Sequence, residues 1–389
     1  MVPIEWHEEK RRLLAKLEVL SREGSAHENQ LALRLAIDDY LSSRAAQAVI
    51  IDKINVHDLS VPDPMRMAAA IDVRSLPRRA RTGKWFWLPK RNGSFRMVCS
   101  LSAPLRLALA MAKEILIRTH TPGEHVGDWS GRGPHYSIRL LANDLRDASV
   151  VVLADVVNCF PSTNPESACR FGAPVSDLVE ANIHPRRVRL CGPKRTIPST
   201  VSDIPSRTGL PGLLRAGPAA NVLWAVMIDD LPGALPGGVR ANTYADNIAV
   251  ACRSTQEADA VEASLIEYFA DHPAGPFTLR IHRADIDCGF DHLGHNIFRY
   301  DGAIHISPKD ASLARLDARI ENEIRKCDYL LAEVDIEAIT RRCCSPWPAI
   351  TASARDLIRE EVRIAAHYPR CPFGQRDPAS RTTRLCPSR

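Results

Sequence analysis

Two aspartates occupy positions where a carboxylate could carry out chemistry. Asp155 follows residues 149–153, an apolar run that is too short for a helix and typical of a buried strand. Asp246 is expected in a two-residue turn, 246–247, between strands over 241–245 and 248–252. Carboxylates at two adjacent strand ends could share a pair of divalent cations about 3.5–4 Å apart, the arrangement that catalyses phosphoryl transfer. Taken singly, each aspartate is more often a turn former or a helix cap.

The rest of the chain predicts mostly helices around these strands. Residues 1 to about 75 are expected to be helical, because 8–20 and 29–54 carry apolar residues at three-to-four spacing. A hairpin is expected between strands 84–88 and 95–99, since Asn92-Gly93 favours a tight turn. Further helices are expected over 104–118, 223–228, 311–333 and 352–367.

The composition indicates a globular protein. With 389 residues, of which 45% are apolar and 25% charged, the chain can bury a substantial core, which excludes a disordered tail and a small disulfide scaffold. Eleven cysteines without any Cys-x-x-Cys pair indicate reduced thiols and no regular zinc site. No uncharged run approaches the ~18 residues of a membrane span, so we expect a cytoplasmic protein with no membrane partner.

Positive charge is concentrated in one part of the chain. The net charge is only +5, but residues 74–139 contain 13 Lys and Arg against 3 Asp and Glu. Five more basic residues fall within 186–195. This clustering suits a surface that follows nucleic-acid phosphates, and a solvated basic face is the plain alternative.

Six sequence blocks occur in a fixed order over about residues 80–320. They are Pro89-Lys90-x-x-Gly93-x-x-Arg96, Val151-Val152-Leu153-Ala154-Asp155 with Phe160, Gly209-Leu210-Pro211 with Gly217-Pro218 and Asn221, Tyr244-Ala245-Asp246-Asn247, Leu279-x-x-x-Arg283-Ala284-x-Ile286, and Gly289-Phe290-x-x-Leu293-Gly294. This series resembles the reverse transcriptases of prokaryotes, which are related to group II intron proteins, retrons and abortive-infection polymerases. The resemblance implies an α+β right-hand polymerase of fingers, palm and thumb, with both aspartates on an antiparallel palm sheet flanked by helices.

The resemblance implies a catalytic site around the two aspartates. Asp155, Asp246 and Asn247 match the family's catalytic positions. Two Mg²⁺ ions, with Mn²⁺ as the alternative, would bind Asp155, Asp246 and the backbone carbonyl of Val156.

The resemblance also implies residues that bind the incoming nucleotide. Lys90, Arg96 and Arg283 match positions that contact its phosphates. Phe160 matches the steric gate, an aromatic ring that leaves no room for a 2′-hydroxyl and so favours deoxynucleotides.

Three departures from the family pattern predict a slow or specialised enzyme. Asn247 replaces the second aspartate of the signature, and its amide oxygen brings no charge to a metal. Gly212-Leu213 stands where the family has Gln-Gly. Arg283 replaces a common lysine, and a guanidinium is a poor proton donor because it does not deprotonate.

We therefore expect an RNA-directed DNA polymerase that adds dNTPs to a primer 3′-hydroxyl. Its expected partners are an RNA template, a DNA or RNA primer and an associated non-coding RNA. One alternative is a catalytically weakened reverse-transcriptase-like protein that binds RNA in phage defence or intron splicing. Another is untemplated DNA synthesis.

Three domains follow from these expectations. Residues 1–75 would form an N-terminal helical extension packed beside the fingers, and residues 76–308 the fingers and palm. Residues 309–389 would form a helical thumb and a polar C-terminal tail, with no further module after it.

Overall fold

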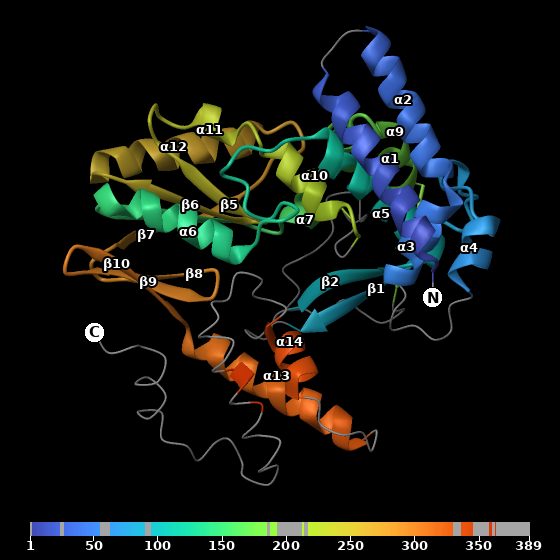
Figure 1. Cartoon of the computed structure of the whole chain (residues 1–389). Helices are drawn as coiled ribbons and strands as arrows, with labels where there is room; N and C mark the ends of the chain where they lie inside the picture. The colour runs from blue at the N-terminus through green and yellow to red at the C-terminus, as the bar shows by residue number, and fades with distance from the viewer. Residues whose placement is uncertain are drawn as a thin grey trace. The chain divides into compact units, whose positions relative to one another are not determined.

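The computed structural model of this chain describes residues 2–23, 27–54, 63–89, 95–184, 187–192, 212–213, 217–329, 336–344, 358–359 and 362. The chain divides into two compact units, Met1–Gly131 with Val152–Arg283 and Arg132–Val151 with Ala284–Arg389 (Figure 1). Helices alternate with small, largely antiparallel sheets, so the fold is mixed α+β. None of the helices in the described ranges is both long and apolar enough to cross a membrane.

The first unit begins with helices, as the sequence predicts for residues 1–75. They are α1 (Ile4–Arg22), α2 (His27–Ser42), α3 (Arg44–Ile54), α4 (Pro64–Ala70) and the single turn η1 (Val73–Ser75). The continuous helix expected over 29–54 is interrupted at Ser43. The Ser43 hydroxyl accepts the backbone N–H of Ala46 at 3.1 Å, so it begins α3 where α2 ends.

These N-terminal helices share a core with α5 (Ala103–Thr119), the helix predicted over 104–118. Leu17, Tyr40 and Ile51 are fully buried there. Lys10 Nζ lies 2.7 Å from Glu114 of α5, and the Tyr40 hydroxyl donates to the same carboxylate. Hydrophobic burial and buried polar contacts therefore join α1 and α2 to α5.

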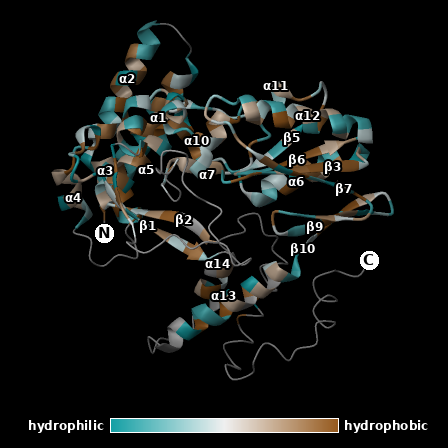
Figure 2. Cartoon of the chain, turned by 180° about the vertical axis from the view of Figure 1, so that it is seen from behind, coloured by the Kyte–Doolittle hydropathy of each residue, from teal (hydrophilic) through white to brown (hydrophobic). Residues whose placement is uncertain are grey.

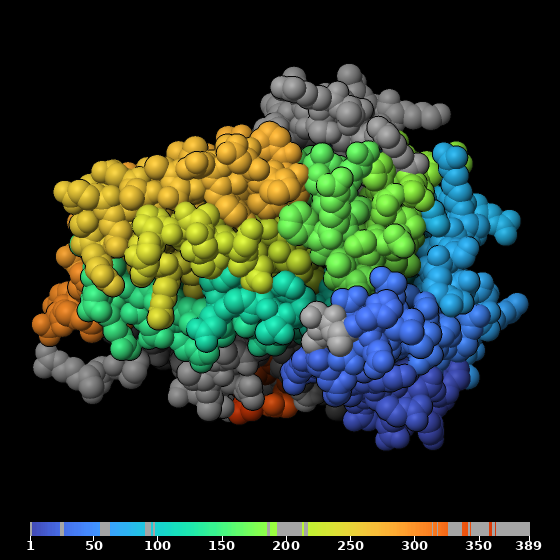
Figure 3. All heavy atoms as spheres, turned by 90° about the horizontal axis from the view of Figure 1, so that it is seen from above, coloured from blue at the N-terminus to red at the C-terminus, as the bar shows by residue number. Residues whose placement is uncertain are grey.

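Helix α5 also packs against α9, in a run of short helices of the same unit. These are α7 (Cys159–Ser162), α8 (Pro165–Arg170) and α9 (Ser176–Ile183). Figure 3 shows the N-terminal helices (blue) and the segment with α8 and α9 (green) on the same face of this unit.

The predicted hairpin is confirmed by β1 (Thr82–Pro89) and β2 (Phe95–Leu101), which pair antiparallel. A third strand, β4 (Arg189–Cys191), pairs parallel to β1 on its other side. The connection between β1 and β2 lies outside the described residues.

The two aspartates belong to a four-stranded sheet in the order β5-β6-β3-β7. Its strands are β5 (Ala241–Tyr244), β6 (Asn247–Cys252), β3 (Val150–Val156) and β7 (Leu279–Asp285). Figure 2 shows hydrophobic residues along β3 and β6, in agreement with the burial of Val152, Ile248 and Val250. Helix α12 (Thr255–Asp271) packs against β6. Helix α10 (Ala220–Met227) contains most of the helix expected over 223–228 and begins three residues earlier.

The second unit combines helices with a small antiparallel sheet, β10-β9-β8. Its elements are α6 (Pro134–Asp144), η2 (Leu145–Asp147), β8 (Phe290–His292), β9 (His295–Tyr300), β10 (Ala303–Pro308), α13 (Asp310–Tyr329) and α14 (Ile336–Cys344). Arg299 of β9 contacts η2 by donating to the carbonyl of Leu145, the first residue of η2, at 2.6 Å. The helix predicted from 311 is confirmed as α13. The helix expected over 352–367 and the polar tail lie almost wholly outside the described residues.

Candidate active site

Asp155 and Asp246 lie on neighbouring strands of the four-stranded sheet. The backbone N–H of Val156 donates to the carbonyl of Asp246 at 3.0 Å, which places the two aspartate backbones about one strand spacing, ~5 Å, apart. Both residues are half-buried, and the Asp155 side chain is 43% exposed. The sheet therefore places the two aspartates that the sequence singled out on neighbouring strands, where both are half-buried.

The turn between β5 and β6 is shifted by one residue from the predicted position. Tyr244 pairs with Asn247, so the turn consists of Ala245 and Asp246, and Asn247 is the first residue of β6. Ala245, and not Asn247, has the positive φ of +51°. This register pairs Thr243 with Ile248, and both residues are buried.

Asn247 contacts the aspartate beside it. Its side-chain N–H₂ donates to Asp246 Oδ1 at 3.2 Å and to the carbonyl of Tyr244 at 3.4 Å. In this orientation the amide presents its donor, not its oxygen, to the carboxylate. Asn247 therefore orients the Asp246 carboxylate.

A third carboxylate, Asp128, reaches the same turn. It accepts the backbone N–H of Ala245 and its own backbone N–H. Burial raises the pKa of Asp128 to about 6; the two hydrogen bonds oppose the rise, and the nearby charge of Asp246 adds to it. Its Oδ2 atom is buried and has no hydrogen-bond partner in the described structure.

Phe160 lies in α7, a few residues after β3, and is 7% exposed. Leu213 donates its backbone N–H to the carbonyl of Phe160 at 2.8 Å. Gly212 is so close that a Cβ there would lie 2.2 Å from the same carbonyl oxygen. Gly212 and Leu213, which depart from the family pattern, thus pack directly on the backbone of Phe160, the predicted steric gate. Only glycine fits at position 212.

Two arginines of β7 have different surroundings. Arg280 Nη1 lies 3.9 Å from Asp155 Oδ2, whereas Arg283 pairs with Glu262 at 2.5 Å and Asp259 at 2.7 Å on α12. Arg283 donates hydrogen bonds to these two carboxylates, which raise its pKa further above its ordinary value. The role of Arg283 in nucleotide binding stays a prediction, and Arg280 is the arginine beside the aspartates.

The other predicted nucleotide contacts are only partly described. Lys90 lies outside the described residues, and of Arg96 the structure gives the backbone alone, in β2. Their roles also stay predictions.

The site offers hard oxygen ligands, the kind that Mg²⁺ prefers together with water and substrate phosphates. Asp155 and Asp246 on adjacent strands fit such a donor set, with the carbonyl of Val156 as a further predicted ligand. In the part of the chain that the structure describes, no group of three or more His, Cys, Asp or Glu side chains could hold a metal ion. A metal here would therefore depend on two carboxylates and on substrate oxygens.

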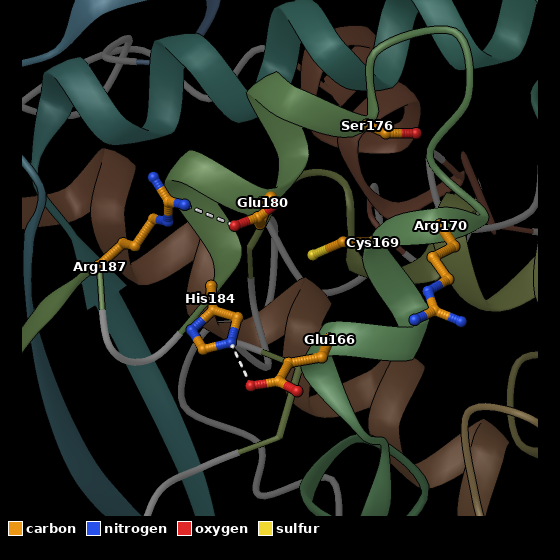
Figure 4. A pocket seen from close by; sticks show the side chains of 7 residues that line it. All are labelled: Glu166, Cys169, Arg170, Ser176, Glu180, His184 and Arg187. Carbon is orange, nitrogen blue, oxygen red and sulfur yellow. Dashed lines mark hydrogen bonds and ion pairs between the residues drawn. The ribbon is translucent and has the colours of Figure 1, made fainter.

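A pocket of about 420 Å³ lies at α8 and α9 (Figure 4). Its walls carry opposite charges in pairs, His184 with Glu166 at 3.4 Å and Arg187 with Glu180 at 2.6 Å. None of the predicted site residues lines it. Arg170 and Cys169 also line it.

Sequence reasoning did not identify Asp128, Trp224 or Arg280. Asp128 had one available signal, since it is one of only three acidic residues within the basic stretch 74–139. Arg280 lies inside a recognised block but at an unassigned position. Trp224 donates its indole N–H to the carbonyl of Ala245 in the turn at 2.7 Å. No signal in the sequence predicted this contact, because a tryptophan in an apolar helix is expected to be buried without a polar partner.

Comparison with known proteins gives a distant likeness to a solved structure. The sequence matches no protein-family model. It also matches no curated protein. Among solved structures, apo telomerase from Candida tropicalis, truncated from the C-terminal domain, is similar with a TM-score of 0.38 and 11% sequence identity. The likeness covers 60% of this chain and 56% of the telomerase chain, so the match spans little more than half the length of that protein.

Proposed function

We propose that the protein is an RNA-directed DNA polymerase that joins dNTPs to a primer 3′-hydroxyl. The observation that carries this proposal is the position of Asp155 and Asp246 on adjacent strands, connected through the Val156–Asp246 backbone hydrogen bond of 3.0 Å. The six ordered sequence blocks, which resemble those of reverse transcriptases, support the same reaction class.

In this proposal Asp155 and Asp246, with the Val156 carbonyl, would hold two Mg²⁺ ions. The ions would stabilise the attacking and leaving oxygens of the phosphoryl transfer when bound. Asn247 keeps the Asp246 carboxylate oriented through its side-chain donor, and Arg280 offers a planar set of donors to phosphate oxygens beside Asp155. Phe160 would bound the space for the sugar of the nucleotide and exclude a 2′-hydroxyl.

The test is primer extension on primed poly(rA) with dTTP, in Mg²⁺ and separately in Mn²⁺. Asp155→Asn and Asp246→Asn each keep the side-chain shape and remove one charge, and we expect each to lower the rate by at least ~100-fold. Asp39→Asn, at an exposed carboxylate of α2, is the matched control. If neither metal supports extension that depends on Asp155, the proposal is wrong.

A second candidate function is RNA binding without synthesis. Two observations favour it: Asn247 presents a donor to Asp246, and Arg283 is engaged by Asp259 and Glu262. Both groups are then committed to their own chain, and the site holds fewer charges for a nucleotide.

This candidate predicts salt-sensitive RNA binding that Asp155→Ala leaves unchanged. Filter binding at several salt concentrations, on the same variants as the extension assay, separates the two functions. Loss of RNA binding in Asp155→Ala would contradict the second candidate. Sequencing the extension product on two different templates distinguishes templated from untemplated synthesis.

A further inference from the structure

The turn that carries Asp246 is in an unfavourable conformation. Ala245 has φ of +51°, in the left-handed region that costs an L residue roughly 1–2 kcal/mol. Neither glycine nor asparagine stands at this position to reduce that cost. The conformation must therefore be imposed by contacts outside the hairpin.

Both backbone polar groups of Ala245 are bound by side chains from distant parts of the sequence. Trp224 Nε1 donates to the Ala245 carbonyl at 2.7 Å, and the Asp128 carboxyl accepts the Ala245 N–H. The two bonds act on the two polar backbone groups of one residue. They fix its φ and ψ, and with them the direction in which the next residue, Asp246, leaves the turn.

Trp224 is held rigidly in the core. Its side chain is fully buried, stacked on Phe269 and edge-on to Phe277, with ring centroids 6.3 and 5.3 Å away. The indole has one donor, and it is directed at the Ala245 carbonyl.

Asp128 lies next to the turn because the segment 125–127 before it runs along the edge of β5. Thr243 donates its N–H to the carbonyl of His125 at 2.8 Å, and Gly127 donates to the carbonyl of Thr243 at 2.7 Å. The loop before this segment is anchored by Asp229, which accepts the N–H of Gly123 at 2.8 Å. These contacts hold the backbone of Asp128 at a fixed position relative to the β5–β6 hairpin.

The placement of Asp128 costs stability, which is typical of a functional position. Its Oδ2 atom is buried without a hydrogen-bond partner in the described structure, and burying a polar group unpaired is unfavourable. A third metal ligand is the competing explanation, but no cluster of three such side chains able to hold a metal occurs in the described ranges. Asp128 instead accepts the backbone N–H groups of Ala245 and of Asp128 itself.

We propose that Asp128 and Trp224 are positioning residues that fix the Ala245 turn and thereby hold the Asp246 carboxylate beside Asp155. This inference rests on the proposed function for its catalytic consequence, but not for its structural one. The variants that separate the two are Asp128→Ala, which removes the acceptor, and Asp128→Asn, which retains an acceptor oxygen and removes the charge. Trp224→Phe removes the indole donor and retains a ring, and Trp6→Phe in α1 is its control.

The structural test is hydrogen–deuterium exchange of the full-length protein, followed in peptides that cover residues 241–252. We expect amides of the turn to exchange at least about tenfold faster in Asp128→Ala and Trp224→Phe. Asp128→Asn and Trp6→Phe should resemble the wild type. Unchanged exchange of the turn in Asp128→Ala would overturn the inference, whatever the protein's activity.

The catalytic test is steady-state dTTP incorporation by the same variants, at a temperature where each is folded by circular dichroism. Asp128→Ala should lower kcat about 10- to 100-fold with the KM for dTTP changed less than about twofold, since the nucleotide contacts remain. Asp128→Asn should retain most of the wild-type kcat. Equal losses in Asp128→Asn and Asp128→Ala, with a raised Mg²⁺ requirement, would instead identify a third metal ligand and overturn the positioning role. An inactive wild type would contradict the proposed function alone, and the exchange experiment would then decide the inference.

Discussion

Arg280 and Arg283 show how one strand gives two identical residues different surroundings. They are three positions apart on β7, and side chains separated by an odd number of residues lie on opposite faces of a strand. Arg283 pairs with two carboxylates of α12, while Arg280 lies beside Asp155 and is 76% exposed. In the proposed reaction Arg280, which is largely exposed and contacts Asp155, is therefore the arginine of β7 that would contact an incoming phosphate.

We predict that Arg280→Ala raises the KM for dTTP about tenfold, because a charge-assisted contact to phosphate is lost. Arg280→Lys should recover part of the affinity, since a lysine keeps the charge but not the planar pair of donors. Arg283→Ala should lower the melting temperature and leave the KM unchanged. Steady-state kinetics with melting curves check all three, and a higher KM in Arg283→Ala than in Arg280→Ala would reverse the assignment.

Single residues divide into those that the local sequence predicts and those that it does not. The position of Asp155 and Asp246 on adjacent strands was predictable from the resemblance of the ordered sequence blocks, since each aspartate taken singly is more often a turn former or a helix cap. The position of the positive φ in the β5–β6 turn was not predictable from the local sequence. Asparagine tolerates that conformation best, which favoured Asn247, but the structure uses Ala245 because Trp224 and Asp128 bind its backbone from 21 and 117 positions away. Bonds at such separations leave no local pattern.

The hairpin of β8 and β9 contains histidines that are buried in the neutral state. His292 is 6% exposed, and burial, followed by the charges of His295 and Lys309, lowers its pKa to about 4. His135 of α6 packs edge-on against His295 at 5.4 Å, and burial lowers the pKa of both. Each of these side chains resists protonation while the unit is folded.

We predict that the second unit loses stability on mild acidification. The unfolded chain takes up a proton at His292 near pH 6.5, but the folded chain does so only near pH 4, so the free energy of unfolding falls as the pH is lowered between these values. His292 alone would contribute about 3 kcal/mol over this range. Urea denaturation at pH 7, 6, 5 and 4.5, followed by hydrogen exchange in peptides of residues 284–329, measures the slope. His292→Gln should flatten it and His282→Gln, at an exposed histidine of β7, should not; an equal slope in both variants would contradict the prediction.

Helices and strands were predictable where a long apolar periodicity or a pair of turn-forming residues marked them in the sequence. The hairpin β1–β2 and the helix α5 follow directly from Asn92-Gly93 and from a clean apolar stripe. The interruption of the helix at Ser43 was missed, because the apolar spacing continues through a serine that acts as a cap. The sheet of β8 to β10 was also missed. Its strands have only three to six residues, and an alternation of apolar and polar residues is confined to Ile304-His305-Ile306-Ser307 in β10, which is too short to mark a sheet.

At the scale of the molecule, the N-terminal helices are part of the same compact unit as α5. Composition and periodicity predicted helices over residues 1–75 but could not tell an appended domain from part of a shared core. The distinction depends on contacts such as that of Tyr40 with Glu114, 74 positions apart. The boundary at residue 75 stays a prediction, and it can be tested directly.

We predict that a chain beginning at residue 76 does not fold cooperatively. Removing α1 to α3 would expose the apolar side chains of α5 that they cover and would leave Glu114 without Lys10 and Tyr40.

In the full-length protein, Leu17→Ala should lower the free energy of unfolding by about 2–5 kcal/mol, because Leu17 is fully buried. Leu31→Ala, at a side chain that is 54% exposed, should change it by less than about 0.5 kcal/mol. Thermal melts and size-exclusion chromatography are the measurements. A monomeric 76–389 chain that melts as sharply as the full-length protein would show that the N-terminal helices are a separate extension.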